Sequence, residues 1–186
     1  ISSKPDVPKF DLLNLPRPKR EEPWGYVKVA EGCDRVCGFC AIPSFRGPQR
    51  SRSISEIREE VISLELQEVV LVAQDLASWA RDQRESPEGI VDLVKEISGI
   101  VPWVRLLYLY PSSLSGELVE IIANGPVPYF DLSLQHVSGP LLRKMRRWGD
   151  GERFTNVIKD IREIRPDAAF RTNFIVGYPG ETEEDH

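Results

Sequence analysis

Apolar residues occur along the chain in two alternating patterns. Nearly continuous apolar runs, which are typical of strands buried in a parallel sheet, are separated by segments with helical spacing. The clearest run is valine-rich and covers residues 68–73. The pattern predicts further strands at residues 26–29, 104–109, 130–134 and 170–176.

The first helix is predicted directly after Ser53. Apolar residues from Ile54 to Leu64 recur at the spacing of one helical face, and Ser53 and Glu56 stand where a capping box places them. Further helices are predicted at residues 89–97, 116–123, 140–147 and 153–164.

The order of a strand followed by a helix repeats about five times, without hairpin turn signals between the strands. Such alternation implies parallel strands joined by crossover connections. The order alone fits both a doubly wound sheet and a barrel. A complete eight-stranded barrel needs about 250 residues, and the chain has 186. We therefore expect an α/β fold with an open sheet or a partial barrel.

The N-terminal part differs in composition from the rest. Residues 2–23 hold five prolines among many charges, and proline removes a backbone donor and fixes φ. We expect residues 1–23 to be a linker or extended arm and residues 24–186 to be the folded core. The chain begins with Ile1 and ends in an acidic segment typical of the first turn of a helix. It is therefore expected to be a piece of a longer protein, truncated at the C-terminus.

Charge and composition exclude several classes of protein for this chain. A hydrophobic share of 41% excludes a wholly disordered chain. No apolar run approaches the ~20 residues that a spanning helix needs, and no secretory signal is visible, so we expect a cytoplasmic protein with no membrane partner. The formal net charge of −5 argues against a strong nucleic-acid surface. Basic clusters at residues 46–52 and 143–147 are expected to be solvated faces.

All three cysteines lie within eight residues, directly after the first predicted strand. The carboxyl ends of parallel strands are where α/β folds hold their sites, and an intracellular chain uses grouped thiols mainly for metal or redox chemistry. Thiolates are soft ligands that suit iron. Cys33, Cys37 and Cys40 could hold three irons of a four-iron cluster and leave the fourth iron open.

Two other interpretations of the cysteines remain. A structural zinc ion needs four ligands, and the two histidines, His136 and His186, are about a hundred residues or more from the cysteines. The thiols could also be unrelated buried side chains.

The cysteine segment resembles a known family. Cys33, Cys37 and Cys40, with Phe39 before the last cysteine, match the CxxxCx-aromatic-C signature of the radical S-adenosyl-L-methionine (SAM) superfamily. The resemblance extends from about residue 26 to the end and implies a partial (β/α) barrel of the radical SAM type. Four segments are similar to the methylthiotransferases of this superfamily, namely residues 31–47, 71–75, 132–136 and 171–181.

Within that family, the sequence favours the branch that modifies a ribosomal protein. Residues 41–47 read AIPSFRG, 72–75 read VAQD, 108–111 read YLYP and 134–136 read LQH. The transfer-RNA branch usually has VVPYTRG, GQN, a His-Pro turn and LQSGS at these places. The resemblance implies transfer of a methylthio group to the β-carbon of an aspartate in a small-subunit ribosomal protein. A transfer-RNA methylthiotransferase acting on a modified adenosine, another radical SAM enzyme and a cluster-free ribosome-binding module are the alternatives.

The same resemblance implies the cofactors. Cys33, Cys37 and Cys40 would bind a 4Fe-4S cluster, and the fourth iron would bind S-adenosyl-L-methionine. The family pattern also includes an N-terminal domain with a second 4Fe-4S cluster and a C-terminal TRAM domain that recognises the substrate. Both are expected outside this segment. The electron donor is not indicated by the sequence.

The resemblance also implies SAM contacts near the ends of strands. Gln74 and Asp75 would meet the SAM amino group, Gln135 would bond the ribose or the carboxylate, and Arg171 would neutralise the carboxylate. The same residues have plainer interpretations. Asp75 could cap a helix, Gln135 could be a satisfied loop amide, and Arg171 could form a surface salt bridge.

Ile175 and Gly177 resemble the strand that packs on the adenine of SAM in this superfamily. The match departs from the family pattern twice. Asn173 stands where the first glycine is usual, and the glutamate is Glu181, one residue late. His136 is expected to have a structural or substrate-facing role.

Overall fold

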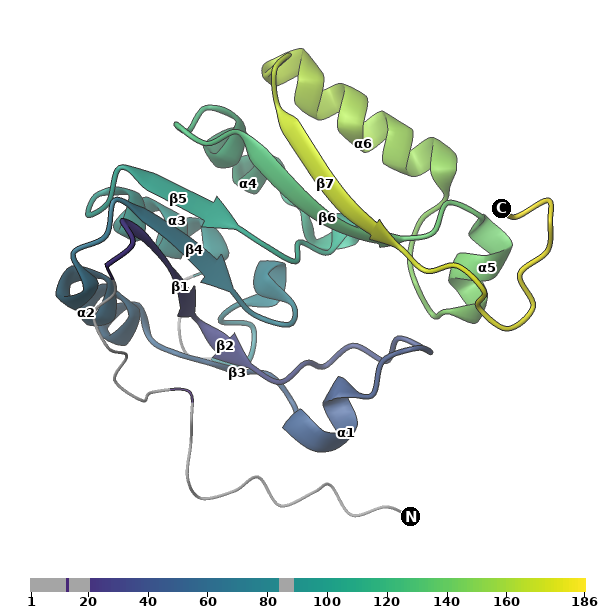
Figure 1. Ribbon diagram of the computed structural model, residues 1–186, viewed down its shortest axis with the longest axis horizontal. Coiled ribbons are helices and arrows are strands. Elements are labelled where there is room, and N and C mark those ends of the chain that lie inside the picture. The colour runs from purple at the N-terminus through teal and green to yellow at the C-terminus, as the bar shows by residue number, and fades with distance from the viewer. Residues whose placement is uncertain (1–12, 14–20, 84–88) are drawn as a thin grey trace.

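The computed structural model describes residue 13 and residues 21–83 and 89–186. Five strands in this part run parallel. They form a sheet of β1 (Trp24–Lys28), β4 (Glu68–Val72) and β5 (Trp103–Leu106), in that order, and a pair of β6 (Tyr129–Gln135) and β7 (Ala169–Phe174). A single parallel bridge between Leu109 and Leu132 joins the two parts, so the strand order continues from β5 to β6 (Figure 1).

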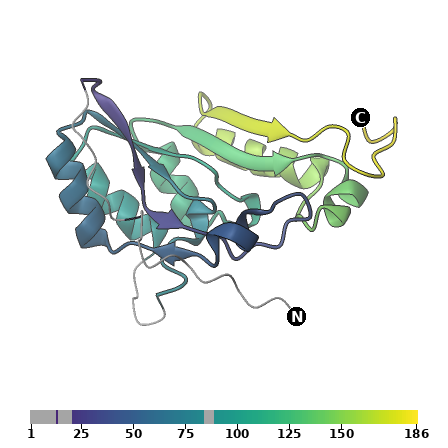
Figure 2. The same ribbon diagram turned by 60° about the horizontal axis from the view of Figure 1, so that its bottom comes forward.

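Four helices connect the strands and pack beside one another. α2 (Ile54–Leu64) contacts α3 (Ile90–Ser98), α3 contacts α4 (Gly116–Ala123), and α4 contacts α6 (Gly151–Ile164). In Figures 1 and 2 these helices lie on one side of the curved row of strands. A doubly wound sheet would have helices on both faces. The arrangement is a partial (β/α) barrel, as the sequence predicts.

The hydrophobic core lies between the strands and this layer of helices. Val27, Leu71 and Leu106 are neighbours in register on three strands, and each is at most 2% exposed. The capping box predicted for α2 is confirmed, because Ser53 Oγ accepts from the N–H of Glu56 and the Glu56 carboxylate accepts from the N–H of Ser53. A local cap therefore marks the start of α2, the helix that connects β1 to β4.

The cysteines belong to an excursion that leaves the barrel after β1. β2 (Ala30–Glu31) and β3 (Arg50–Ser51) pair antiparallel and close the excursion, which carries the short helix α1 (Ile42–Arg46). Gly32 opens it with φ +81°, and a Cβ there would lie 2.2 Å from the backbone oxygen of Pro48. The sequence pattern does not predict the antiparallel pair, because strands of two residues are too short to show a period.

Two predicted strands end earlier than expected. The strand predicted at residues 104–109 ends at Leu106, since Tyr108 takes a left-handed φ of 62° and turns the chain. The strand predicted at residues 170–176 ends at Phe174, so Ile175 and Gly177 lie in the loop that follows β7.

The helix predicted at residues 140–147 is shorter as well. It is α5 (Gly139–Lys144), because the chain turns at Arg146, whose φ is 54°. Two single 3₁₀ turns, which the pattern does not predict, follow β4 and β5; they are η2 (Leu76–Ser78) and η3 (Pro111–Ser113). The other predicted elements differ from the structure by at most two residues at either end.

The expectation that both basic clusters are solvated faces is wrong at two positions. Arg52 is 5% exposed, pairs with Glu60 and donates to the backbone oxygen of Lys28. Arg147 is 9% exposed and lines the pocket described below. A run of basic residues does not show which of its members turns inward.

The arm predicted at residues 1–23 lies almost entirely outside the described residues. Leu13, which is described, is buried. Among the described helices, none is both long and apolar enough to cross a membrane.

Two isoleucines of α2 test how the helix packs. Ile57 is fully buried, whereas Ile62 is 46% exposed. Ile57→Ala leaves a cavity and is expected to lower the free energy of unfolding by about 2–5 kcal/mol. Ile62→Ala is the matched control, with an expected loss of about 0.5 kcal/mol or less. Urea unfolding measures both variants, and equal losses would contradict the packing of α2.

Candidate functional site

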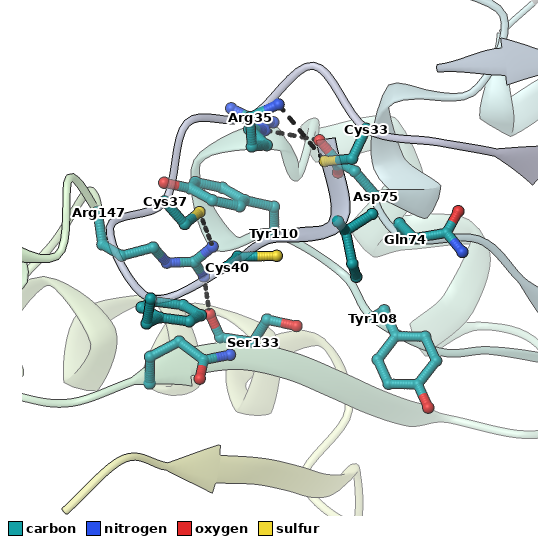
Figure 3. Close-up of a pocket in the computed structure, with 13 residues that line it drawn as sticks. Cys33, Arg35, Cys37, Cys40, Gln74, Asp75, Tyr108, Tyr110, Ser133 and Arg147 are labelled. Atoms are coloured by element: carbon teal, nitrogen blue, oxygen red, sulfur yellow. Dashed lines mark hydrogen bonds and ion pairs between the residues drawn. The ribbon is translucent and has the colours of Figure 1, made fainter. Parts of the chain in front are cut away.

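A pocket of about 160 Å³ opens at the carboxyl ends of the strands. Its walls come from the cysteine loop, the ends of β4, β5 and β6, and the segment after α5 (Figure 3). Sulfur, guanidinium, amide and aromatic groups all face it. The lining residues are Cys33, Arg35, Cys37, Phe39, Cys40, Ile42, Gln74, Asp75, Tyr108, Tyr110, Ser133, Gln135 and Arg147.

Backbone hydrogen bonds fix the cysteine loop at both ends and in the middle. The N–H of Cys33 donates to the oxygen of Gly47 at 3.1 Å, and the N–H of Cys40 donates to the oxygen of Cys37 at 3.1 Å. In the middle, the N–H of Gly38 donates to the oxygen of Met145 at 2.8 Å. A Cβ at Gly38 would lie 2.8 Å from the hydroxyl oxygen of Tyr178 and 3.3 Å from the backbone oxygen of Lys144, so the loop packs closely against both residues there.

All three thiols are free of disulfide bonds. Cys33 is buried, and Cys37 and Cys40 are half-buried. Burial raises the pKa of the Cys33 thiol, the nearby Asp75 carboxylate raises it further, and a hydrogen bond from the N–H of Arg35 partly offsets these effects. A metal ligand must be a thiolate, so a bound cation would have to displace the proton of Cys33.

Three thiols are the donor set that an iron–sulfur cluster uses. Among the described residues, no group of three or more His, Cys, Asp or Glu side chains is arranged around a single metal position. A structural zinc ion needs four ligands that converge on one point. The thiolates of an iron–sulfur cluster each bind a different iron and do not need to converge in this way.

An ion pair ties the cysteine loop to the end of β4. Arg35 Nε donates to Asp75 Oδ2 at 2.6 Å, and Arg35 Nη2 donates to Ser113 Oγ at 2.6 Å. Asp75 is 4% exposed and also accepts from Ser78 Oγ at 2.8 Å. Its carboxylate does not cap η2. Asp75 therefore supports the loop that carries the cysteines.

The Tyr110 ring lies between two arginines. The guanidinium carbons of Arg35 and Arg147 each lie 3.9 Å from the ring centroid. Two guanidinium groups at this distance cannot share one face, so they flank the ring on opposite faces (Figure 3). The Tyr110 hydroxyl accepts from the N–H of Trp148 at 3.2 Å. This stack joins the cysteine loop to the segment after α5.

Several buried polar atoms at the pocket have no hydrogen-bond partner in the described structure. They are Gln74 Oε1, Asp75 Oδ1 and Arg147 Nε. Leaving a buried polar group unpaired costs about 1–3 kcal/mol, so such groups point to a bound partner. Two acceptors and one donor suit a ligand that carries both an ammonium and an anionic group. The residues present therefore fit a SAM molecule beside a thiolate-bound cluster.

Two of the five described non-glycine residues with a positive φ line the pocket. Tyr108 and Gln135, which both line the pocket, have φ angles of 62° and 74°. Non-glycine residues rarely adopt left-handed φ values, and such strain gathers at functional sites. At Gln135 the strain coincides with an irregularity in the pairing of β6 with β7 between Leu132 and Gln135.

Comparison with known proteins identifies the family. The profile of the radical SAM superfamily matches residues 27–186. The chain belongs to the radical SAM superfamily.

Three proteins named ribosomal protein uS12 methylthiotransferase RimO are similar to most of the chain. The one from Sorangium cellulosum is 45% identical over 86% of this chain and 35% of that protein. Those from Aquifex aeolicus and Moorella thermoacetica are each 42% identical, over 94% and 97% of this chain and 40% and 44% of their own lengths. The chain thus spans less than half the length of these relatives.

Solved structures agree on the radical SAM fold. The radical S-adenosylmethionine methyltransferase TsrM from Kitasatospora setae, with cobalamin and a 4Fe-4S cluster bound, matches 87% of this chain and 32% of that chain with a TM-score of 0.60 and 17% identity. The cobalamin-dependent radical enzyme OxsB, with S-adenosylmethionine bound, matches 81% of this chain and 23% of that chain with a TM-score of 0.60 and 12% identity. At such low identity these similarities concern the fold alone.

The structure brings together seven of the residues that the radical SAM resemblance singles out. They line one pocket and are Cys33, Cys37, Phe39, Cys40, Gln74, Asp75 and Gln135. Arg171, Ile175 and Gly177 are not among its lining residues. Arg171 Nη1 donates to Asp131 Oδ2 at 2.6 Å across β6 and β7, and Asp131 is almost fully buried.

The loop after β7 has its own internal bonds. The Glu181 carboxylate accepts from the N–H groups of Gly177 and Tyr178 and lies 3.4 Å from His136 Nε2. Burial alone would raise the pKa of Glu181, but the two backbone N–H groups and His136 together outweigh it and lower the pKa. The His136 side chain is buried and accepts from the N–H of Ser138, which is a structural role.

Sequence reasoning missed six lining residues of the radical SAM pocket. Weak signals existed for some of them. Arg35 stands between two of the cysteines, Tyr108 and Tyr110 belong to the YLYP segment, and Arg147 belongs to a basic cluster. Ile42 and Ser133 carry no signal that distinguishes them from other residues of their segments. The six are Arg35, Ile42, Tyr108, Tyr110, Ser133 and Arg147.

Asp75→Asn tests the support of the cysteine loop. The change keeps the shape of the side chain and leaves Arg35 without its ion pair, so the free energy of unfolding is expected to fall by about 1–3 kcal/mol. Hydrogen exchange of residues 33–40 should accelerate as well, because the loop loses its tie to β4.

Asp167→Asn is the matched control for this variant. Asp167 pairs with Arg165 at the same distance of 2.6 Å, but its side chain is 73% exposed. Solvent screening makes such pairs worth about 0–1 kcal/mol. An Asp75→Asn loss no larger than that of the control, with unchanged exchange in the loop, would contradict the proposed support.

Proposed function

We propose that this chain is the catalytic core of a radical SAM methylthiotransferase that acts on a ribosomal protein. One observation carries the chemical part of the proposal. Three free thiols line a single pocket, at which buried polar atoms of Gln74, Asp75 and Arg147 lack partners. The names of the similar proteins support the reaction class.

Cys33, Cys37 and Cys40 would hold a 4Fe-4S cluster in this pocket. When bound, the cluster supplies the electron that cleaves S-adenosyl-L-methionine reductively. The work of the protein is to bind and orient the reactants and to exclude water. Arg35 and Asp75 hold the loop in place, and the stack of Arg35 on Tyr110 closes the pocket beside it.

The unpartnered acceptors would bind the amino group of SAM. Gln74 Oε1 and Asp75 Oδ1 are both buried at the pocket, and an ammonium group needs several acceptors at once. Gln135 would bond the ribose or the carboxylate, and Phe39 would offer an apolar contact from the cysteine loop. Their position on the pocket wall supports these roles.

Three further SAM contacts are proposed at the edge of the site. Arg171 would meet the SAM carboxylate, and Ile175 and Gly177 would pack on adenine. β7 pairs directly with β6, whose Gln135 lines the pocket, which supports a site that extends toward β7. The Arg171 side chain remains 48% exposed although it pairs with Asp131, so part of the guanidinium is accessible.

Iron content and SAM cleavage test the core of the proposal. Anaerobic reconstitution of the chain is expected to give about four irons per chain, and dithionite with SAM should then yield methionine and 5′-deoxyadenosine. Alanine in place of Cys33, Cys37 or Cys40 should abolish both. Ser44→Ala is the control, because Ser44 is exposed on α1 and does not line the pocket. Iron-free wild-type protein, or cysteine variants that keep iron and turnover, would refute the proposal.

The proposed substrate is ribosomal protein uS12, with the methylthio group added to the β-carbon of an aspartate. The shared name of the relatives supports this choice. The relatives extend beyond the matched segment. Those further regions would provide a second 4Fe-4S cluster and a domain that recognises the substrate. A ribosomal substrate places the reaction in the cytoplasm. The electron donor is left open.

Chimeric enzymes test the substrate branch. This chain is inserted in place of the matching segment of the Aquifex aeolicus relative and, separately, of a transfer-RNA methylthiotransferase. We expect mass spectrometry to find a methylthio group on uS12 with the first chimera and no modified adenosine with the second. Cys33→Ala in the first chimera should remove the signal. Activity only in the transfer-RNA chimera would contradict the ribosomal assignment.

A further inference from the structure

Arg147 is a buried cation that is held rigidly beside the cysteines. It is 9% exposed, and its guanidinium donates from Nη2 to the backbone oxygen of Ser133 and stacks on Tyr110. Its backbone N–H donates to the oxygen of Leu142 at 2.8 Å. Figure 3 shows the side chain reaching across the pocket wall toward Cys37. Burying and ordering an arginine in this way is unfavourable unless its charge is compensated.

No carboxylate compensates this charge within the described part of the chain. The ion pairs of these residues do not include Arg147, and its Nε has no hydrogen-bond partner. Arg35, on the other face of Tyr110, is different, because it pairs with Asp75 at 2.6 Å. The anionic partner of Arg147 is therefore to be sought in the pocket itself. The one pocket group that its guanidinium already reaches, besides Ser133 and Tyr110, is Cys37 Sγ, 3.6 Å from Nη1.

We propose that Arg147 is the counter-charge of the cluster and sets its reduction potential through a hydrogen bond to the Cys37 sulfur. The inference rests on the proposed function, in which Cys37 binds iron. Reduction by one electron from an external reductant lowers the net charge of the cluster by one elementary charge, and no bond breaks in this step. A fixed positive charge and a donor at a cluster sulfur stabilise the more negative state. Arg147 therefore raises the potential and makes the cluster easier to reduce.

A purely structural role for Arg147 makes a different prediction. If the residue only supported the loop, its replacement would lower the amount of cluster bound, but the clusters that form would keep their potential. The potential thus separates charge compensation from support, whereas iron content alone does not.

The experiment compares the reconstituted wild-type chain with Arg147→Gln and Arg147→Lys. Redox titration followed by electron paramagnetic resonance gives the midpoint potential, and the three cysteines of the chain provide for one cluster. Arg147→Gln should shift the potential downward. Arg147→Lys should give a smaller downward shift, because an ammonium keeps the charge but not the planar stack and paired donors. Arg143→Gln, an exposed arginine of α5, is the control and should leave the potential unchanged.

Every outcome decides the matter. A downward shift in Arg147→Gln with an unchanged control supports the inference. Should one Arg147 variant bind no iron, the shift of the other decides alone. Loss of the cluster in both, with the cluster kept in Arg143→Gln, would overturn the inference, because a purely supporting role predicts that result. Wild-type potentials in all variants that hold the cluster would overturn the role of Arg147 and leave the proposed function standing. A wild-type chain that binds no cluster would overturn the proposed function and this inference with it.

Discussion

The ion pair between Arg35 and Asp75 determines where the three cysteines sit. Their loop is an excursion closed by two strands of two residues each, and a backbone hydrogen bond from Gly38 to Met145 joins its middle to the segment after α5. Arg35, which stands between two cysteines, reaches a carboxylate buried at the end of β4 and stacks on Tyr110 at the end of β5. One side chain from the loop thus connects it to the segments that follow two neighbouring strands, and all three groups line the pocket.

The charges around the pocket form a consistent arrangement. Arg35 is neutralised by Asp75, whereas Arg147 has no carboxylate partner in the described structure and donates from Nη1 to the Cys37 sulfur. Three thiolates bring negative charge into a half-buried space, which is unfavourable without cations. Iron and the Arg147 guanidinium together would compensate the negative charge of the thiolates. Burial raises the pKa of the Cys33 thiol.

The sequence predicted the fold and singled out the three cysteines that line one pocket, for physical reasons that particular residues illustrate. Burial on both faces makes residues 68–73 an unmistakable strand, and Ser53 with Glu56 marks a helix start through local bonds alone. Three cysteines in eight residues are equally local. The contacts of Arg35 with Ser113 and of Arg147 with Ser133 join residues that are distant in sequence, and no local pattern encodes them. Arg171 is a further example, since its pairing with Asp131 depends on the register of β6 with β7.

Mössbauer spectroscopy of the chain reconstituted with ⁵⁷Fe tests the central claim most directly, because it distinguishes the iron atoms of one cluster. Three irons bound by Cys33, Cys37 and Cys40 should be alike, and one iron should lack a cysteine ligand. Adding SAM is expected to change the isomer shift of that single iron and to leave the other three unaltered. A spectrum of four equivalent irons that does not respond to SAM, or of a single-ion site, would contradict the account.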